Sequence, residues 1–84
     1  MNVNNPRLPK IDEIVIWDSN FGYDLVQFKG LSPAGYYYAV ISLTGNYGLE
    51  KMAVDKNQVK KYSDELIDEL TIKYGYKHDK DRIN

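Results

Sequence analysis

Cysteine is absent from this chain of 84 residues, which removes every role that a thiol plays in small proteins. Disulfide bonds, zinc–thiolate sites and cysteine nucleophiles are all excluded, so the fold has to be stable through packing alone. Long apolar runs are absent as well. No uncharged stretch approaches the roughly 18 residues that cross a bilayer, and none near the start is typical of a signal peptide. We therefore expect a cytoplasmic protein with no membrane partner.

A net excess of positive charge is also lacking. Lysine and arginine contribute 11 residues, whereas aspartate and glutamate contribute 12, which gives a formal net charge of -1. The chain therefore lacks the long-range attraction by which basic domains bind nucleic acids and anionic membranes. A chain of this size buries only about 60% of the surface that its unfolded form exposes. An enclosed active site would compete with its single small core for the same apolar side chains.

Tyrosine, by contrast, is unusually abundant, with eight residues beside two phenylalanines and one tryptophan. Asparagine and lysine are frequent too. AT-rich codons favour such a composition, which indicates a bacterium of low GC content, or one of its phages, as the source.

The chain divides into an arm, one domain and a tail. Pro6 and Pro9 predict that residues 1–10 form a flexible N-terminal arm, because proline disfavours regular structure around it. Residues 11–76 carry the apolar pattern of a single domain. Residues 77–84 form a charged C-terminal tail, which we expect to fray.

Four segments rich in β-branched and aromatic residues predict strands, because clusters of turn-forming residues separate them. They cover residues 11–17, 23–29, 36–44 and 49–54. Trp17 ends the first strand, where we expect its ring at the edge of the core and its indole N–H directed to water or to a carbonyl.

The dipeptide Gly45-Asn46 predicts a two-residue turn of type II′ between the last two strands, with Thr44 opposite Tyr47. This register assigns alternate side chains to opposite faces of the sheet. The face expected to form the core contains Tyr37, Ala39, Ile41, Leu43, Met52 and Val54. The opposite face contains Tyr36, Tyr38, Tyr47 and Lys51.

Beyond Asp55 the apolar spacing changes to three or four residues, which predicts an amphipathic helix. Asp55 caps its start in this interpretation, and Gly75 ends it in the left-handed conformation. An alternative stays open, in which the helix ends near Leu70 and residues 70–77 form a fifth strand. We prefer the continuous helix, because its apolar stripe is nearly complete. The stripe consists of Val59, Tyr62, Leu66, Leu70 and Tyr74.

The fold class that follows is α+β in two layers. A small four-stranded, mainly antiparallel sheet is followed by one C-terminal amphipathic helix, in the order ββββα. Because one helix covers only one face of a sheet, we expect the other face to be open to solvent, to a partner or to a second copy of the chain. Homo-oligomerisation is therefore left open.

Residue patterns that support catalysis are missing. His78 is the single histidine, and it lies in the charged tail, where we expect nothing to orient it. The glycines do not have the spacing of a phosphate-binding loop or a dinucleotide site. We therefore expect no enzyme, no catalytic residue, no cofactor and no metal. A pocket that groups Asp12, Asp18 or Asp24 with His78 would revive the enzyme hypothesis.

Two surfaces are candidates for binding instead. The first is the tyrosine-bearing sheet face with Tyr36, Tyr38, Tyr47 and Lys51, which could anchor a protein or stack bases. The second is the acidic face of the helix, which could complement a basic groove on a partner. Its residues are Asp64, Glu65, Asp68 and Glu69. The plainer interpretation is a solvated face, in which Lys61 pairs with Glu65 and Glu69 pairs with Lys73.

These features favour a small non-enzymatic protein-interaction module that regulates or inhibits a larger intracellular partner. A phage or mobile-element protein acting on a nucleic-acid enzyme of the host would suit the acidic helix. The alternative is a single-stranded nucleic-acid-binding module that uses the tyrosine-rich sheet face. The balanced charge favours the protein partner, since phosphate attraction requires a basic track.

Overall fold

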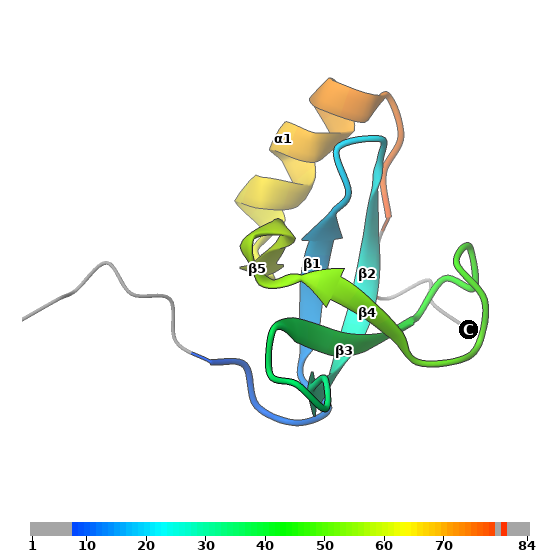
Figure 1. Cartoon of the computed structure of the whole chain (residues 1–84). Coiled ribbons are helices and arrows are strands. Elements are labelled where there is room, and N and C mark those ends of the chain that lie inside the picture. The colour runs from blue at the N-terminus through cyan, green and yellow to red at the C-terminus, as the bar shows by residue number, and fades with distance from the viewer. Residues whose placement is uncertain (1–7, 79, 81–84) are drawn as a thin grey trace, which may run out of the picture.

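The computed structural model of the protein describes residues 8–78 and 80, which form a five-stranded antiparallel sheet followed by one helix (Figure 1). A single 3-10 turn, η1 (Lys56–Gln58), joins the last two strands, and the helix α1 covers Asp64–Tyr74. The strands are β1 (Ile14–Asp18), β2 (Tyr23–Leu31), β3 (Tyr37–Ser42), β4 (Met52–Asp55) and β5 (Val59–Lys61). The predicted α+β class with a C-terminal helix is confirmed.

The order of the strands across the sheet is β4-β3-β2-β1-β5. The first four strands form a meander, and the chain then returns so that β5 pairs with the outer side of β1. The strands β4 and β5 are therefore the two edges of the sheet. No helix in the described part of the chain is long and apolar enough to cross a membrane.

The helix starts later than predicted, and the residues before it form a fifth strand. The side chain of Asp55 accepts from the N–H of Asn57 and caps only η1, whereas Ser63 caps α1 by accepting from the N–H of Leu66 at 3.1 Å. Val59 belongs to β5. Its spacing of three residues from Tyr62 is therefore not part of the apolar stripe of a helix, contrary to the prediction. A separate strand over residues 70–77 is also wrong, because α1 continues to Tyr74.

The end of the helix is as predicted. Gly75 lies in the left-handed region with φ of 81°, and its N–H donates to the carbonyl of Thr71. Glycine reaches this conformation without the steric cost of a Cβ atom.

The predicted register of the β3–β4 hairpin is wrong by one residue. Tyr38 lies opposite Val54 and Val40 lies opposite Met52, and a loop over residues 43–51 replaces the two-residue turn. Because side chains alternate along a strand, a shift of one residue exchanges the two faces. Tyr37, which was expected in the core, is consequently 50% exposed, and Tyr38 is turned inward beside Val40.

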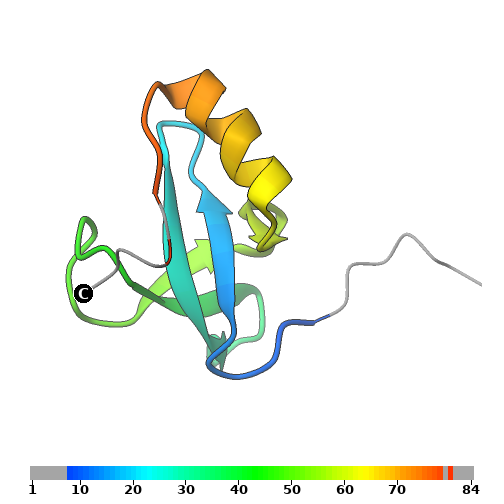
Figure 2. The ribbon, with the colours of Figure 1, turned by 180° about the vertical axis from the view of Figure 1, so that it is seen from behind.

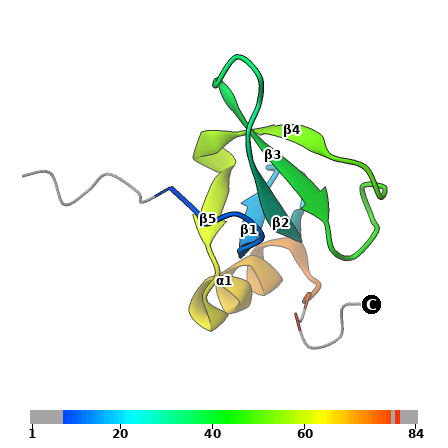
Figure 3. The same ribbon diagram turned by 90° about the horizontal axis from the view of Figure 1, so that it is seen from below.

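Apolar side chains fill both faces of the β1–β2 hairpin. On one face, the helix packs onto the sheet and forms a buried cluster of Ile16, Tyr23, Leu25, Ile67 and Leu70 (Figure 2). On the other face, the sheet curls around a second cluster of Val15, Val26, Val40 and Val54 (Figure 3). The expectation of one open sheet face is therefore wrong, because β3 and β4 cross over β1 and β2 and cover it.

The C-terminal end of α1 is fastened to the end of β1. The hydroxyl of Tyr74 donates to the carboxylate of Asp18 at 2.5 Å, and the ammonium of Lys73 lies 3.7 Å from the same carboxylate. Burial raises the pKa of Asp18, but the hydrogen bonds from Tyr74 and from the N–H of Asn20, with the charge of Lys73, outweigh it and lower the pKa below 3.8. Lys73 thus pairs with Asp18 and not, as expected, with Glu69.

Ser63→Ala tests the observed start of the helix. Removal of the capping hydroxyl leaves an N–H of the first turn without its acceptor, so we expect the free energy of unfolding to fall by about 1 kcal/mol. Asp55→Ala is the matched control, and its loss should be smaller, because Asp55 caps only one 3-10 turn. Urea denaturation measures both. A larger loss for Asp55→Ala than for Ser63→Ala would contradict the helix start at Asp64.

Tyr74→Phe tests the connection between α1 and β1. The folded-state pKa of Asp18 is lowered, so its contribution to stability is present above its ordinary value of 3.8 and disappears as the pH falls through the folded-state pKa. The stability difference between wild type and Tyr74→Phe should therefore be largest near neutral pH and should narrow in acid. Denaturation curves at several pH values measure this difference. A gap of constant size down to the lowest pH would show that Tyr74 does not act through the charge of Asp18.

Candidate functional site

A groove of about 550 Å³ opens along β5, where the curled sheet leaves one end of the second apolar cluster accessible. Its apolar floor consists of Val15, Tyr38 and Val59. Leu8 and Pro9, which precede β1, line it as well. The charged residues that line it are Lys56, Lys60, Lys61 and Glu13. Lys60 directs its ammonium to the other side of β5, so the groove combines apolar contact area with two positive charges and one negative charge.

Strand pairing explains how these residues come together. Val15 of β1 lies opposite Lys61 of β5, and Val59 lies opposite Trp17, so Val59 joins the second apolar cluster. The next residue, Lys60, points to the other side of the strand, where its ammonium donates to the carbonyl of Asn57 at 3.4 Å. The lysines beside the groove are exposed, and β5 is an edge strand with pairing on one side.

The ring of Tyr38 forms part of the groove, but one of its faces is already covered. The ammonium of Lys56 lies above this ring, 5.8 Å from its centroid. The edge of the ring packs against Phe28 in a T-shaped arrangement, with 5.0 Å between the centroids. Tyr38 is thus held between the core and a lysine side chain, so it offers the groove a fixed apolar wall.

The predicted tyrosine-bearing surface is distributed over different parts of the molecule. Tyr36 is 76% exposed in the loop between β2 and β3, whereas Tyr38 is half-buried at the groove. Tyr47 lies in the loop over residues 43–51 and packs against Trp17, with 4.8 Å between the ring centroids. Lys51 is exposed just before β4. Tyr38 and Tyr47 contact different neighbours, so these residues do not form the shared aromatic platform that the predicted register implied.

The four acidic residues of the predicted helix face, Asp64, Glu65, Asp68 and Glu69, are all exposed. Two of them have a role within the fold, because Asp64 and Glu65 lie in the first turn of α1, where negative charge stabilises the helix dipole. Asp68 lies 3.6 Å from the ammonium of Lys77. Among residues 8–78 and 80, no three acidic or histidine side chains converge as metal ligands would.

Trp17 lies where the sequence placed it, half-buried at the edge of the second cluster. Its indole N–H donates to the side-chain carbonyl of Gln58 at 3.0 Å. This bond joins β1 to η1 and so fixes the position of the turn that carries Lys56.

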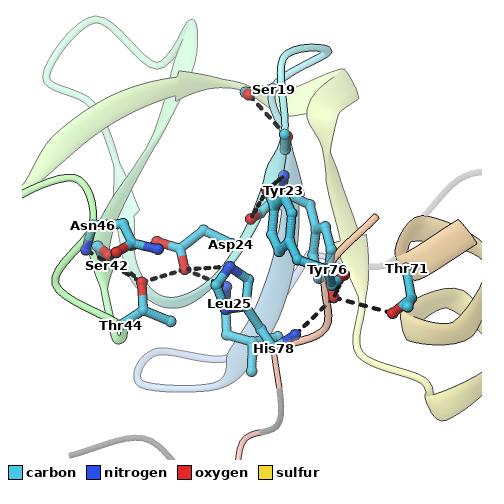
Figure 4. Close-up of polar contacts among 11 residues, drawn as sticks. Ser19, Tyr23, Asp24, Leu25, Ser42, Thr44, Asn46, Thr71, Tyr76 and His78 are labelled. Carbon is cyan, nitrogen blue, oxygen red and sulfur yellow. Dashed lines mark hydrogen bonds and ion pairs between the residues drawn. The ribbon is translucent and has the colours of Figure 1, made fainter. Parts of the chain in front are cut away.

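Sequence reasoning named Asp24 of β2 as a possible neighbour of His78 but did not predict that its carboxylate is buried. Asp24 is fully buried, and its carboxylate accepts hydrogen bonds from the N–H of Leu25 at 3.0 Å, the hydroxyl of Ser42 at 2.5 Å and the hydroxyl of Thr44 at 2.6 Å (Figure 4). These donors satisfy the hydrogen-bonding capacity of the buried carboxyl oxygens. They also connect the end of β3 to β2 where the loop over residues 43–51 begins.

His78 is held by contacts with β2 and with the segment after α1, contrary to the expectation that nothing would orient it. Its backbone N–H donates to the hydroxyl of Tyr23 at 2.8 Å, and its ring packs edge-on against Tyr23 and Tyr76 (Figure 4). Its Nε2 atom lies 3.9 Å from Asp24. Within the predicted tail, the structure describes Lys77, His78 and Lys80. Residues 79 and 81–84 lie outside the described residues, as do residues 1–7 of the predicted arm.

The structure therefore brings Asp24 and His78 together, as the enzyme hypothesis required. The order of the groups differs from that of a catalytic triad, in which the imidazole lies between hydroxyl and carboxylate. Here the carboxylate of Asp24 lies between the hydroxyl of Ser42 and the imidazole. This arrangement suits a structural role, because it fastens the segment after α1 to β2.

Comparison with known proteins finds nothing similar to this chain. No family model, no curated protein and no solved structure matches it.

Asp24→Ala tests the structural role of the buried carboxylate. The substitution leaves three hydrogen-bond donors without their acceptor, so we expect a loss of about 3 kcal/mol in the free energy of unfolding. Asp68→Ala is the control, because it removes an exposed carboxylate and should change stability by less than about 1 kcal/mol. Thermal and urea denaturation measure both variants. Equal stability of the two variants would contradict a structural role for Asp24.

Proposed function

We propose that this chain is a non-enzymatic protein-interaction module, and that a segment of the partner binds in the groove along β5. The observation that carries the proposal is the combination of an apolar floor, exposed lysines beside it (Lys56 and Lys61) and an edge strand at one place. Binding sites on proteins typically combine an apolar surface with a few placed polar groups. The second apolar cluster supports the floor from below, so the groove is preformed.

The size of the groove favours a short segment of a partner over a whole folded surface. A volume of about 550 Å³ accommodates a few side chains. A module of this size, with no chemistry of its own, acts by occupying or blocking a surface of a larger protein. In this proposal the chain is a regulator or inhibitor, which agrees with the function expected from its composition.

A single-stranded nucleic-acid-binding module is the second candidate, because lysines stand beside an aromatic ring in the groove. Base stacking needs an open ring face, however, and Lys56 covers one face of Tyr38. Tyr36 and Tyr47 lie in other loops and cannot extend a stack from the groove. The net charge of -1 also gives little attraction for a phosphate backbone. The observations therefore favour a protein partner.

Selection from unbiased libraries tests the proposed function. The immobilised protein is exposed in parallel to a random peptide library and to a random single-stranded DNA pool. We expect enrichment of peptides, and competition among the enriched peptides for one site. Failure to enrich any peptide, or enrichment of DNA alone, would contradict the proposal.

The absence of cysteine provides a clean control for the position of the site. Lys61→Cys carries a unique thiol at the groove, and a bulky maleimide attached there should block every selected peptide. Lys51→Cys with the same label is the matched control outside the groove and should bind as the wild type does. The unlabelled Lys61→Cys variant separates the effect of the label from that of the substitution. Equal inhibition by the two labels would place the site elsewhere.

A further inference from the structure

The edge strand β5 has the features of a template for another strand. Within the described sheet it pairs with β1 on one side, and its backbone groups on the other side have no strand to pair with. Extended peptides bind to such edges through main-chain hydrogen bonds, and their alternate side chains enter neighbouring pockets. All three residues of β5 line the groove, so a strand added at this edge would lie along it.

Positive charge predominates along the groove. On the groove side, β5 carries Lys61 and η1 adds Lys56, and both side chains are exposed. Glu13 is the acidic residue that lines the groove, and its carboxylate already accepts the backbone N–H of Lys10 at 2.9 Å. The groove is therefore complementary to negative charge.

The alternation of side chains along a strand decides which residues of an added strand face the groove. In an extended peptide, successive side chains point to opposite sides, so every second residue faces the side of β5 that carries Val59 and Lys61. An apolar residue on that side can contact the floor at Val59, and a residue two positions away can place its carboxylate beside Lys61 or Lys56. Each lysine has an exposed side chain that can reach such a group.

We propose that the occupant of the groove is an acidic, extended segment of a partner protein, which adds a strand to the edge of β5 and directs its carboxylates to Lys56 and Lys61. The inference rests on the proposed function and specifies the chemistry of the partner. Apolar side chains of the segment contact the floor, main-chain hydrogen bonds set its direction, and the lysines select its charge.

Defined peptides test the three parts of this inference separately. The probe is a short fluorescein-labelled peptide in which valine and glutamate take turns at every second position, with serine between them, so that both face the groove. A glutamine–valine peptide of equal length lacks the charge, and a glutamate–valine peptide with methylated backbone nitrogens lacks the donors for strand pairing. A single-stranded oligonucleotide of equal net charge represents the nucleic-acid alternative. Fluorescence anisotropy measures the binding of all four probes.

We expect the glutamate–valine peptide to bind. Its affinity should fall as the salt concentration rises, because its carboxylates interact with exposed lysines. The uncharged and methylated peptides and the oligonucleotide should bind about tenfold more weakly. Lys61→Glu should lower the affinity for the glutamate–valine peptide by about tenfold as well. Lys51→Glu changes the net charge equally but lies outside the groove, and it should leave the affinity nearly unchanged. Circular dichroism and thermal denaturation verify that both variants are folded.

Each contrary outcome has a defined meaning. Equal binding of the glutamine–valine peptide would overturn charge selection, and equal binding of the methylated peptide would overturn strand addition. Equal weakening by Lys51→Glu would overturn the position of the site, and tighter binding of the oligonucleotide would favour the nucleic-acid alternative. If the library selects groove-binding peptides without acidic residues, this inference fails while the proposed function stands. If the library selects no peptide, the proposed function fails.

Discussion

Burial on both faces of the β1–β2 hairpin is the constraint on which the rest of the structure depends. Val15 and Val26 face one side, and Ile16 and Leu25 face the other. A single helix covers only one of these faces. The remaining strands therefore have to curl over the second face, and this curl brings residues of β3 and β5 against one apolar cluster. The groove lies where the curled strands no longer cover the second apolar cluster. Apolar side chains and the edge strand β5 therefore meet there.

Much of the fold was predictable from local patterns, because those patterns report local physics. The β-branched segments correctly indicated the first four strands, and Gly75 correctly marked the end of the helix. Two-sided burial also left a signal, namely the uninterrupted apolar run of Ile14-Val15-Ile16. An interpretation that assumes alternation overlooks such a run, since alternation describes strands with one solvated face. The prediction of an open sheet face was wrong for this reason.

The errors concern features that depend on contacts distant in the sequence. β5 has only three residues, and its pairing with β1 overrides the helical spacing that Val59 and Tyr62 share. The register of β3 and β4 depends on how the chain crosses the hairpin, and the turn-like sequence at Gly45 could not determine it. Because the observed register differs from the predicted one by one residue, the predicted tyrosine surface is divided between the groove and two loops.

The candidate site was hidden in the sequence for the same reason. The sequence analysis assigned three lysines to the polar side of a helix. In the structure they belong to a turn and a strand beside the groove, namely to η1 (Lys56) and to β5 (Lys60 and Lys61). Asp24 and His78 are 54 positions apart, and only the folded chain shows that they are neighbours. A charged residue such as Asp24 inside an apolar strand was the one available sign of a buried polar network.

The most direct test of the proposed binding site is an NMR titration of the isotope-labelled chain with the glutamate–valine peptide. We predict that the largest changes in backbone amide signals occur over residues 56–61 and at Glu13 and Val15, together with slower hydrogen exchange along β5. Changes concentrated at Tyr36, Tyr47 and Lys51, or on the acidic face of α1, would contradict it.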